Sequence, residues 1–139
     1  MNLTAPTRAK DITREWQQID AAGEILGRVA SRIATLLMGK QKPYFVRHLD
    51  CGDYVVVTNV AKIKVTGKKL IQKIYTSYSG YPGGIKKEAL KDLLVRKPED
   101  VMRRAVAGML PKNKLRDILL RRLYIYAGEE HPYKEKLKT

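Results

Sequence analysis

The order of apolar and polar residues predicts strands and helices that alternate along the chain. Apolar residues recur every three or four positions over 25–38, which is typical of a helix that buries one face. A run of mostly β-branched residues over 54–58 predicts a buried strand. Apolar and polar residues alternate over 61–66, where Lys62 and Lys64 face water, and this pattern predicts another strand.

The remaining segments continue this alternation. Pro98 suits the first turn of a helix, because the N–H that proline lacks would have no partner there, and Pro111 ends that helix. Residues 79–84, Ser-Gly-Tyr-Pro-Gly-Gly, predict a loop. We further expect strands over 16–21 and 123–127 and helices over 87–95, 98–110 and 115–122. Strands that alternate with helices predict an α/β fold around a mostly parallel sheet.

A chain of 139 residues has the usual length of one domain. We expect that domain to span 14–128. Residues 1–13 mix Thr, Pro, Lys and Arg without periodicity and predict an extended arm, whereas the polar residues 129–139 predict a tail. The single cysteine, Cys51, cannot form an intrachain disulfide, which indicates a reducing compartment, either the cytoplasm or an organelle matrix.

Net charge narrows the class of partner. The chain has 28 Lys and Arg against 14 Asp and Glu, a formal charge of +14 at pH 7. A polyanion such as RNA, DNA or an anionic membrane surface would neutralise this charge. Apolar runs such as 55–57 are far shorter than the roughly 18 residues that span a bilayer, so we expect no membrane partner.

Residues that would support catalysis or metal binding are scarce. The Gly-Lys pairs at 39–40 and 67–68 lack the upstream glycine and the following Ser or Thr of a phosphate-binding loop. His48, Cys51 and His131 are the only soft or imidazole ligands, and a structural zinc site needs four ligands. A nucleophile pair of Cys51 and His48 is the catalytic alternative, but a free cysteine is more often a packed residue. We therefore expect no catalytic residue, no metal and no cofactor.

Basic residues gather in three stretches, 40–47, 62–73 and 103–122, in which Asp117 is the only acidic residue. One such stretch is explained equally well by a solvated face, but three on a chain of this charge favour contact with a polyanion on several sides. The sequence has no zinc-finger spacing, heptad zipper or evident recognition helix, which favours RNA over DNA. A nucleoid-type DNA-binding protein and an RNA-modifying or RNA-cleaving enzyme remain the alternatives.

The glycine-rich loop over 79–84 adds a candidate contact. Glycines let a backbone approach phosphate oxygens closely, and Tyr75, Tyr78 and Tyr81 lie in or before the loop, where rings can stack on unpaired bases. An ordinary turn whose tyrosines cover the core explains the loop equally well. The residues that we expect to contact RNA are Lys40, Lys42, Arg47, His48, Lys68, Lys69, Tyr78, Gly80, Tyr81, Gly83, Gly84, Arg103, Arg104, Lys112, Asn113, Lys114, Arg121, Arg122 and His131.

Several of these motifs resemble those of the bacterial ribosomal protein L-thirteen family of the large subunit. The similar blocks are Trp16 with 19–21, then 26–31 leading into 39–40, 52–57, 62–68, 79–84, 108–115 and 131–132, in the expected order over 14–133. The sequence departs from the family pattern at Gln17 and Gln18, where larger strand-forming residues are usual. It also departs at Arg116, where a glycine is usual, and at Tyr133, where a second histidine is common.

The resemblance implies a fold and a function. The implied fold is a single three-layer α/β/α domain around a four-stranded, mostly parallel sheet. The implied function is that of a structural, non-catalytic constituent of the large ribosomal subunit, which binds 23S-type rRNA and acts early in subunit assembly. The implied partners are large-subunit rRNA and neighbouring large-subunit ribosomal proteins. The protein would be a monomer within the particle, at the ribosome in the cytoplasm or in an organelle matrix.

Overall fold

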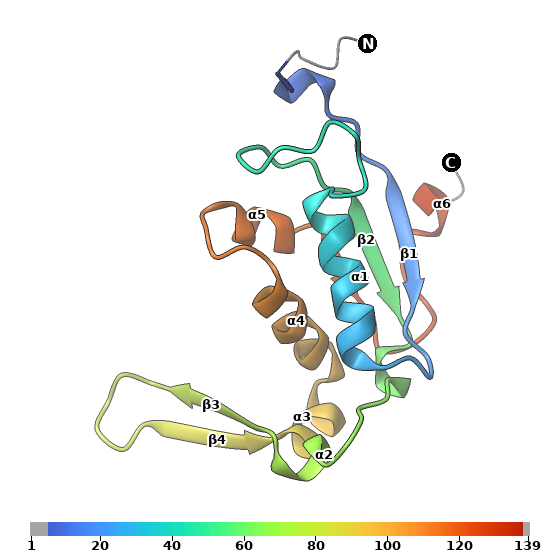
Figure 1. The fold of residues 1–139 in the computed structure, drawn as a ribbon. Helices are drawn as coiled ribbons and strands as arrows, with labels where there is room; N and C mark the ends of the chain where they lie inside the picture. The colour runs from blue at the N-terminus through green and yellow to red at the C-terminus, as the bar shows by residue number, and fades with distance from the viewer. Residues whose placement is uncertain (1–5, 138–139) are drawn as a thin grey trace.

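The main sheet of the fold has three parallel strands. Its middle strand, β2 (Tyr54–Thr58), pairs with β1 (Trp16–Asp20) on one side and with β5 (Leu123–Ile125) on the other. Helix α1 (Leu26–Met38) lies across β1 and β2 (Figure 1). The computed structural model describes residues 6–137, so the first five residues of the predicted arm and the last two of the predicted tail lie outside the described residues. Within 6–137, every helix is too short or too polar to cross a membrane.

One face of the sheet carries the hydrophobic core. Val55 and Val57 of the middle strand are fully buried and face α1 (Leu26–Met38), which packs against α4 (Pro98–Met109). The buried residues of α1 include Val29, Ile33 and Leu37, the spacing that buries one helix face. The other helices are α2 (Lys69–Gln72), α3 (Leu90–Arg96), α5 (Leu115–Leu120) and α6 (Lys134–Leu137), and 3-10 turns lie at Ala9–Asp11 and Val60–Lys62.

The opposite face of the sheet is covered by aromatic rings. Trp16 of β1 stacks on Tyr54 of β2 with ring centroids 4.5 Å apart, and on Tyr133 at 5.0 Å. Tyr124 of β5 extends the cluster, 5.7 Å from Trp16 and 4.5 Å from Tyr133. Helix α6 follows Tyr133 and contacts β1. Tyr133 therefore attaches the C-terminal segment to the sheet.

A two-stranded antiparallel hairpin extends away from the sheet (Figure 1). Its strands are β3 (Ile74–Tyr78) and β4 (Ile85–Ala89), joined by the loop over 79–84. Tyr75 is half-buried against the core. Glu88, at the base of the hairpin, forms an exposed pair with Arg96 of α3 at 2.6 Å.

The predicted parallel sheet is confirmed, but it has three strands, not the four that the resemblance implied. The predicted strand over 61–66 is wrong: its first residues form a 3-10 turn, and Lys64 makes only an isolated bridge to Ile25. Asn59 has a φ of 59° and turns the chain away from the sheet directly after β2. The predicted helix over 87–95 is wrong at its start, because residues 85–89 pair with β3 and the helix begins at Leu90.

Candidate nucleic-acid interface

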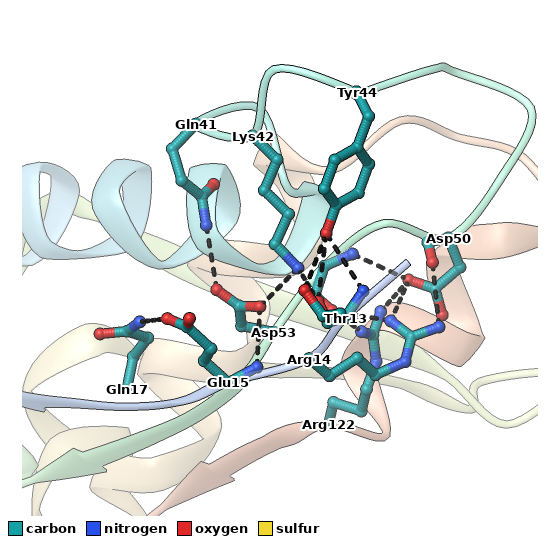
Figure 2. A network of polar contacts seen from close by, with 11 residues as sticks. Thr13, Arg14, Glu15, Gln17, Gln41, Lys42, Tyr44, Asp50, Asp53 and Arg122 are labelled. Atoms are coloured by element: carbon teal, nitrogen blue, oxygen red, sulfur yellow. Dashed lines mark hydrogen bonds and ion pairs between the residues drawn. The ribbon is translucent and has the colours of Figure 1, made fainter. Parts of the chain in front are cut away.

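The loop that joins α1 to β2 (residues 39–53, here the connecting loop) carries Lys40, Arg47 and His48. A network of polar contacts anchors it at its base (Figure 2). The buried Asp53 carboxylate accepts hydrogen bonds from the Glu15 N–H at 3.1 Å and from Gln41 Nε2 at 3.0 Å. It also pairs with Lys42 Nζ at 2.7 Å. The charge of Lys42 is therefore neutralised within the protein.

A second part of the network joins the connecting loop to the start of β1 and the residue before β5. Arg14 Nη1 and Arg122 Nη1 both donate to the Gly52 carbonyl oxygen, at 2.7 Å and 2.6 Å. The same two arginines pair with the Asp50 carboxylate (Figure 2). Burial lowers the pKa of the Arg122 guanidinium, and Asp50 acts in the opposite direction.

Two of the residues that the sequence predicted to contact RNA are held in this network within the protein. Arg122 is only 7 % exposed, whereas its neighbour Arg121 is exposed. The Lys42 side chain is 11 % exposed and lies against Asp53. We therefore leave Lys42 and Arg122 out of the candidate interface and assign them to the support of the connecting loop, whose Lys40, Arg47 and His48 are exposed.

Three predicted residues that are distant in sequence meet at one cavity. Lys40 and Arg47 of the connecting loop and Asn113 of the α4–α5 connection line a cavity of about 370 Å³, which we call the loop cavity. Asn113 Oδ1 accepts a hydrogen bond from the Leu115 N–H at 3.0 Å, at the start of α5. Lys112 and Lys114, on either side of Asn113, are exposed. The first and third basic stretches therefore form one surface.

A second group of cations surrounds Tyr75. Lys73 Nζ lies 5.5 Å and the Arg104 guanidinium carbon 5.0 Å from the Tyr75 ring centroid, within the range of cation–π attraction. Burial raises the pKa of Tyr75, and Arg104 opposes that shift. Both cations line a cavity of about 380 Å³ together with Lys69. Our expected contacts omitted Lys73, although its spacing of four from Lys69 would put both on one face of a helix.

The hairpin loop exposes aromatic rings. Tyr78 is 64 % and Tyr81 74 % exposed, whereas Tyr75 is not available for stacking because it packs on the core. Turn geometry by itself accounts for three glycines, since Gly80 and Gly83 have φ values of +89° and +72° and a Cβ on Gly84 would lie 2.9 Å from the Tyr81 carbonyl oxygen. The glycines therefore fix the turn, and the tyrosines are the part of this loop that can contact a base.

The last predicted contacts differ in exposure. Lys68, Arg103 and Arg121 are exposed. His131 is half-buried, and its Nδ1 accepts a hydrogen bond from the Tyr133 N–H at 3.2 Å, so it helps to hold the C-terminal segment. Cys51 is fully buried. Among residues 6–137, no three or more His, Cys, Asp or Glu side chains are grouped as a metal site would require.

The fold and its exposed cations define the class of this chain as a small basic α/β protein. Comparison with known families narrows this class, because the sequence model described as Ribosomal protein L13 matches residues 14–132. The chain belongs to the ribosomal protein L13 family, and the resemblance noted in its motifs is confirmed.

Individual relatives match over almost their whole length. The chain is 53 % identical over 130 residues to the large ribosomal subunit protein uL13 of Chlorobium phaeobacteroides (strain BS1), covering 94 % of this chain and 87 % of the relative. It is 54 % identical over 130 residues to that of Dehalococcoides mccartyi (strain ATCC BAA-2266 / KCTC 15142 / 195), covering 94 % and 91 %. It is 47 % identical over 133 residues to that of Symbiobacterium thermophilum, covering 96 % and 93 %.

Proposed function

We propose that this chain is a structural constituent of the large ribosomal subunit that binds large-subunit, 23S-type rRNA and supports translation without catalysis. The observation that carries this proposal is membership of the ribosomal protein L13 family over 14–132. The net charge of +14 agrees with it, because a polyanion neutralises such a charge and releases its own counterions.

The proposed interface has three parts. The connecting loop and the α4–α5 connection form the first, the cations around Tyr75 form the second, and the hairpin loop forms the third. Cations position a protein on the phosphate backbone, and exposed rings contact bases. The residues proposed to contact rRNA are Lys40, Arg47, His48, Lys68, Lys69, Lys73, Tyr78, Tyr81, Arg103, Arg104, Lys112, Asn113, Lys114 and Arg121.

The proposal also covers the domain organisation of the chain and its location in the cell. Residues 14–128 would form the rRNA-binding domain, with 1–13 as an arm and 129–139 as a tail. The protein would enter the large subunit early in assembly, as one copy beside other large-subunit ribosomal proteins. Its place would be the ribosome of the cytoplasm. Contacts of Thr7 and Thr13 with Tyr44 support an arm that lies along the connecting loop.

Sedimentation tests the proposed function directly. In a sucrose gradient of native cell lysate, we expect the protein to migrate with large ribosomal subunits and with whole ribosomes. Ribonuclease treatment before the gradient should move it to the top fractions, because the rRNA that holds it is then cut. If most of the protein stays at the top of the untreated gradient, a stable ribosomal role is ruled out.

Lys112 and Lys114 give a prediction about the first part of the interface. Replacing both with alanine should weaken incorporation in a reconstitution mixture of large-subunit rRNA and the other large-subunit proteins. The log–log dependence of binding on salt should become shallower by roughly 0.7–0.9 for each rRNA phosphate that the variant no longer neutralises.

The matched control replaces Lys10 and Lys91 with alanine. Both lysines are exposed and lie outside the proposed interface, and the change in net charge is the same. We expect the control to keep the wild-type salt slope within error. Equal slopes for the two double variants would mean that Lys112 and Lys114 act only through the overall charge.

A further inference from the structure

The walls of the loop cavity are more apolar than a phosphate-binding site requires. Met38 closes one side, Phe45 and Leu49 come from the connecting loop, and Leu115 and Leu119 come from α5. A volume of about 370 Å³ lies within the usual range of sites that enclose a small organic group, about 300–1,000 Å³. A cavity for a phosphate group would instead be lined by donors and cations.

The charged residues of the same cavity indicate what kind of apolar group it accepts. Lys40 and Arg47 are the charged residues that line it, and no carboxylate does so. Asn113 contributes an amide whose carbonyl oxygen already accepts the Leu115 N–H, so its NH₂ group is the donor on that side chain. An apolar recess with cations and an amide donor at its edge suits a flat, polar-edged ring that is attached to phosphates.

We propose that the loop cavity binds one unstacked base of large-subunit rRNA. Phe45 provides the surface on which the base stacks, the Asn113 amide donates to the edge of the base, and Lys40 and Arg47 contact the phosphates on either side. Unstacked bases in loops and bulges are the part of RNA that proteins read most often, through stacking and edge hydrogen bonds. The inference rests on the proposed function and deepens it, because it adds a base contact to an interface built mainly on phosphates.

The anchoring network gives this cavity a defined shape. Asp53 and Asp50 fix the end of the connecting loop through Lys42, Arg14 and Arg122. The opposite wall belongs to the α4–α5 connection, in which Asn113 Oδ1 accepts a hydrogen bond from the Leu115 N–H at the start of α5. Contacts at both ends of the connecting loop therefore reduce the ordering that must occur when a base enters.

The test uses large subunits purified from cells in which a variant replaces the native protein. Leu115→Trp fills the cavity, and Phe45→Ala removes the stacking surface without adding bulk. Ile118→Trp is the matched control: it adds the same side chain on the same helix, at a position that is 43 % exposed and does not line the cavity. The rRNA of each particle is probed with dimethyl sulfate and a carbodiimide, which together report on all four bases.

We expect a base that is protected in wild-type and Ile118→Trp particles to lose its protection in both Leu115→Trp and Phe45→Ala particles. If the Leu115→Trp protein does not fold, as judged by its thermal unfolding in isolation, the Phe45→Ala particles decide the question. Identical reactivity in all particles that contain normal amounts of the protein would overturn the base-binding inference and leave the proposed function intact.

Two other outcomes are distinguishable. Unchanged rRNA reactivity together with loss of a neighbouring ribosomal protein from the Leu115→Trp particles would assign the cavity to a protein side chain and overturn the inference. Absence of the wild-type protein from large subunits would instead overturn the proposed function itself, because that result does not depend on the cavity.

Discussion

Replacing Gly52 with alanine is expected to destabilise the protein strongly. A Cβ at this position would lie 1.6 Å from the carbonyl oxygen and 2.4 Å from the carbonyl carbon of Leu37 in α1. Both atoms are backbone, so α1 or the chain before β2 must move. Overpacking costs about 1–3 kcal/mol and occasionally more, which is a large part of the total stability of about 5–15 kcal/mol for a domain. Urea unfolding followed by far-UV circular dichroism measures the loss.

The shift forced by Gly52→Ala would also disturb the anchoring network, because the Gly52 carbonyl oxygen accepts from both Arg14 and Arg122. Gly27→Ala is the matched control, since no atom lies within 4 Å of its Cβ position in α1. We expect that control to raise stability by about 0.5–1 kcal/mol, as alanine is favoured over glycine inside a helix. A Gly52→Ala protein as stable as wild type would contradict the close backbone contact.

Asp50→Ala is expected to destabilise the protein by about 3–5 kcal/mol. Asp50 neutralises Arg122, whose side chain is 8 % exposed, and Arg14, whose side chain is 30 % exposed. Its loss leaves a buried guanidinium without a counter-charge, and the Gly52 carbonyl oxygen is then its remaining acceptor. The free energy of unfolding in urea is the quantity to measure.

Two comparisons separate charge burial from other effects. Glu88→Gln removes the carboxylate of the exposed pair with Arg96, and exposed pairs contribute little, so we expect no measurable change. The double variant Asp50→Ala with Arg122→Met should lose less stability than the sum of the two single variants, because the buried charge leaves with its partner. Additive losses would show that Asp50 and Arg122 act independently.

Local patterns in the sequence predict most of the body of this fold. The apolar spacing over 25–38 corresponds to α1, and the run over 54–58 corresponds to β2 with the same bounds. The helix expected from Pro98 is confirmed as α4. In each case the signal lies within the element, because burial of one helix face or of a whole strand repeats along the residues that form it.

The hairpin could not be predicted in the same way. Strand β4 consists of Ile-Lys-Lys-Glu-Ala, and lysine, glutamate and alanine favour a helix when nothing opposes them. Pairing with β3 across the loop over 79–84 decides the outcome. The strand predicted over 61–66 does not form, for a related reason. Ile63 and Val65 do pack on the core, as their alternation predicts, but a strand also needs a neighbour along its length.

The sequence shows which stretches of this chain are basic, but it does not show which of their side chains are exposed. Arg121 and Arg122 are adjacent and alike in sequence, yet the first is exposed and the second is buried. The difference arises from Asp50, which is 72 residues away in the chain and is brought close by the pairing of β2 with β5. Sequence charge therefore indicates which stretches are basic, whereas tertiary contacts decide which side chains are available to RNA.

Because of the order of the strands, the sheet can be completed only late in the synthesis of the chain. The middle strand β2 receives its second neighbour from residues 123–125, and Arg122 reaches a Gly52 that was made 70 residues earlier. During synthesis α1 can form as soon as it emerges, but pairing between distant segments is slow and must wait for the later one. Until residues 122–125 have emerged, one edge of β2 is unpaired and Asp50 lacks its buried partner. A nascent chain of this protein therefore contains most of its lysines and arginines before the sheet that positions their side chains is complete.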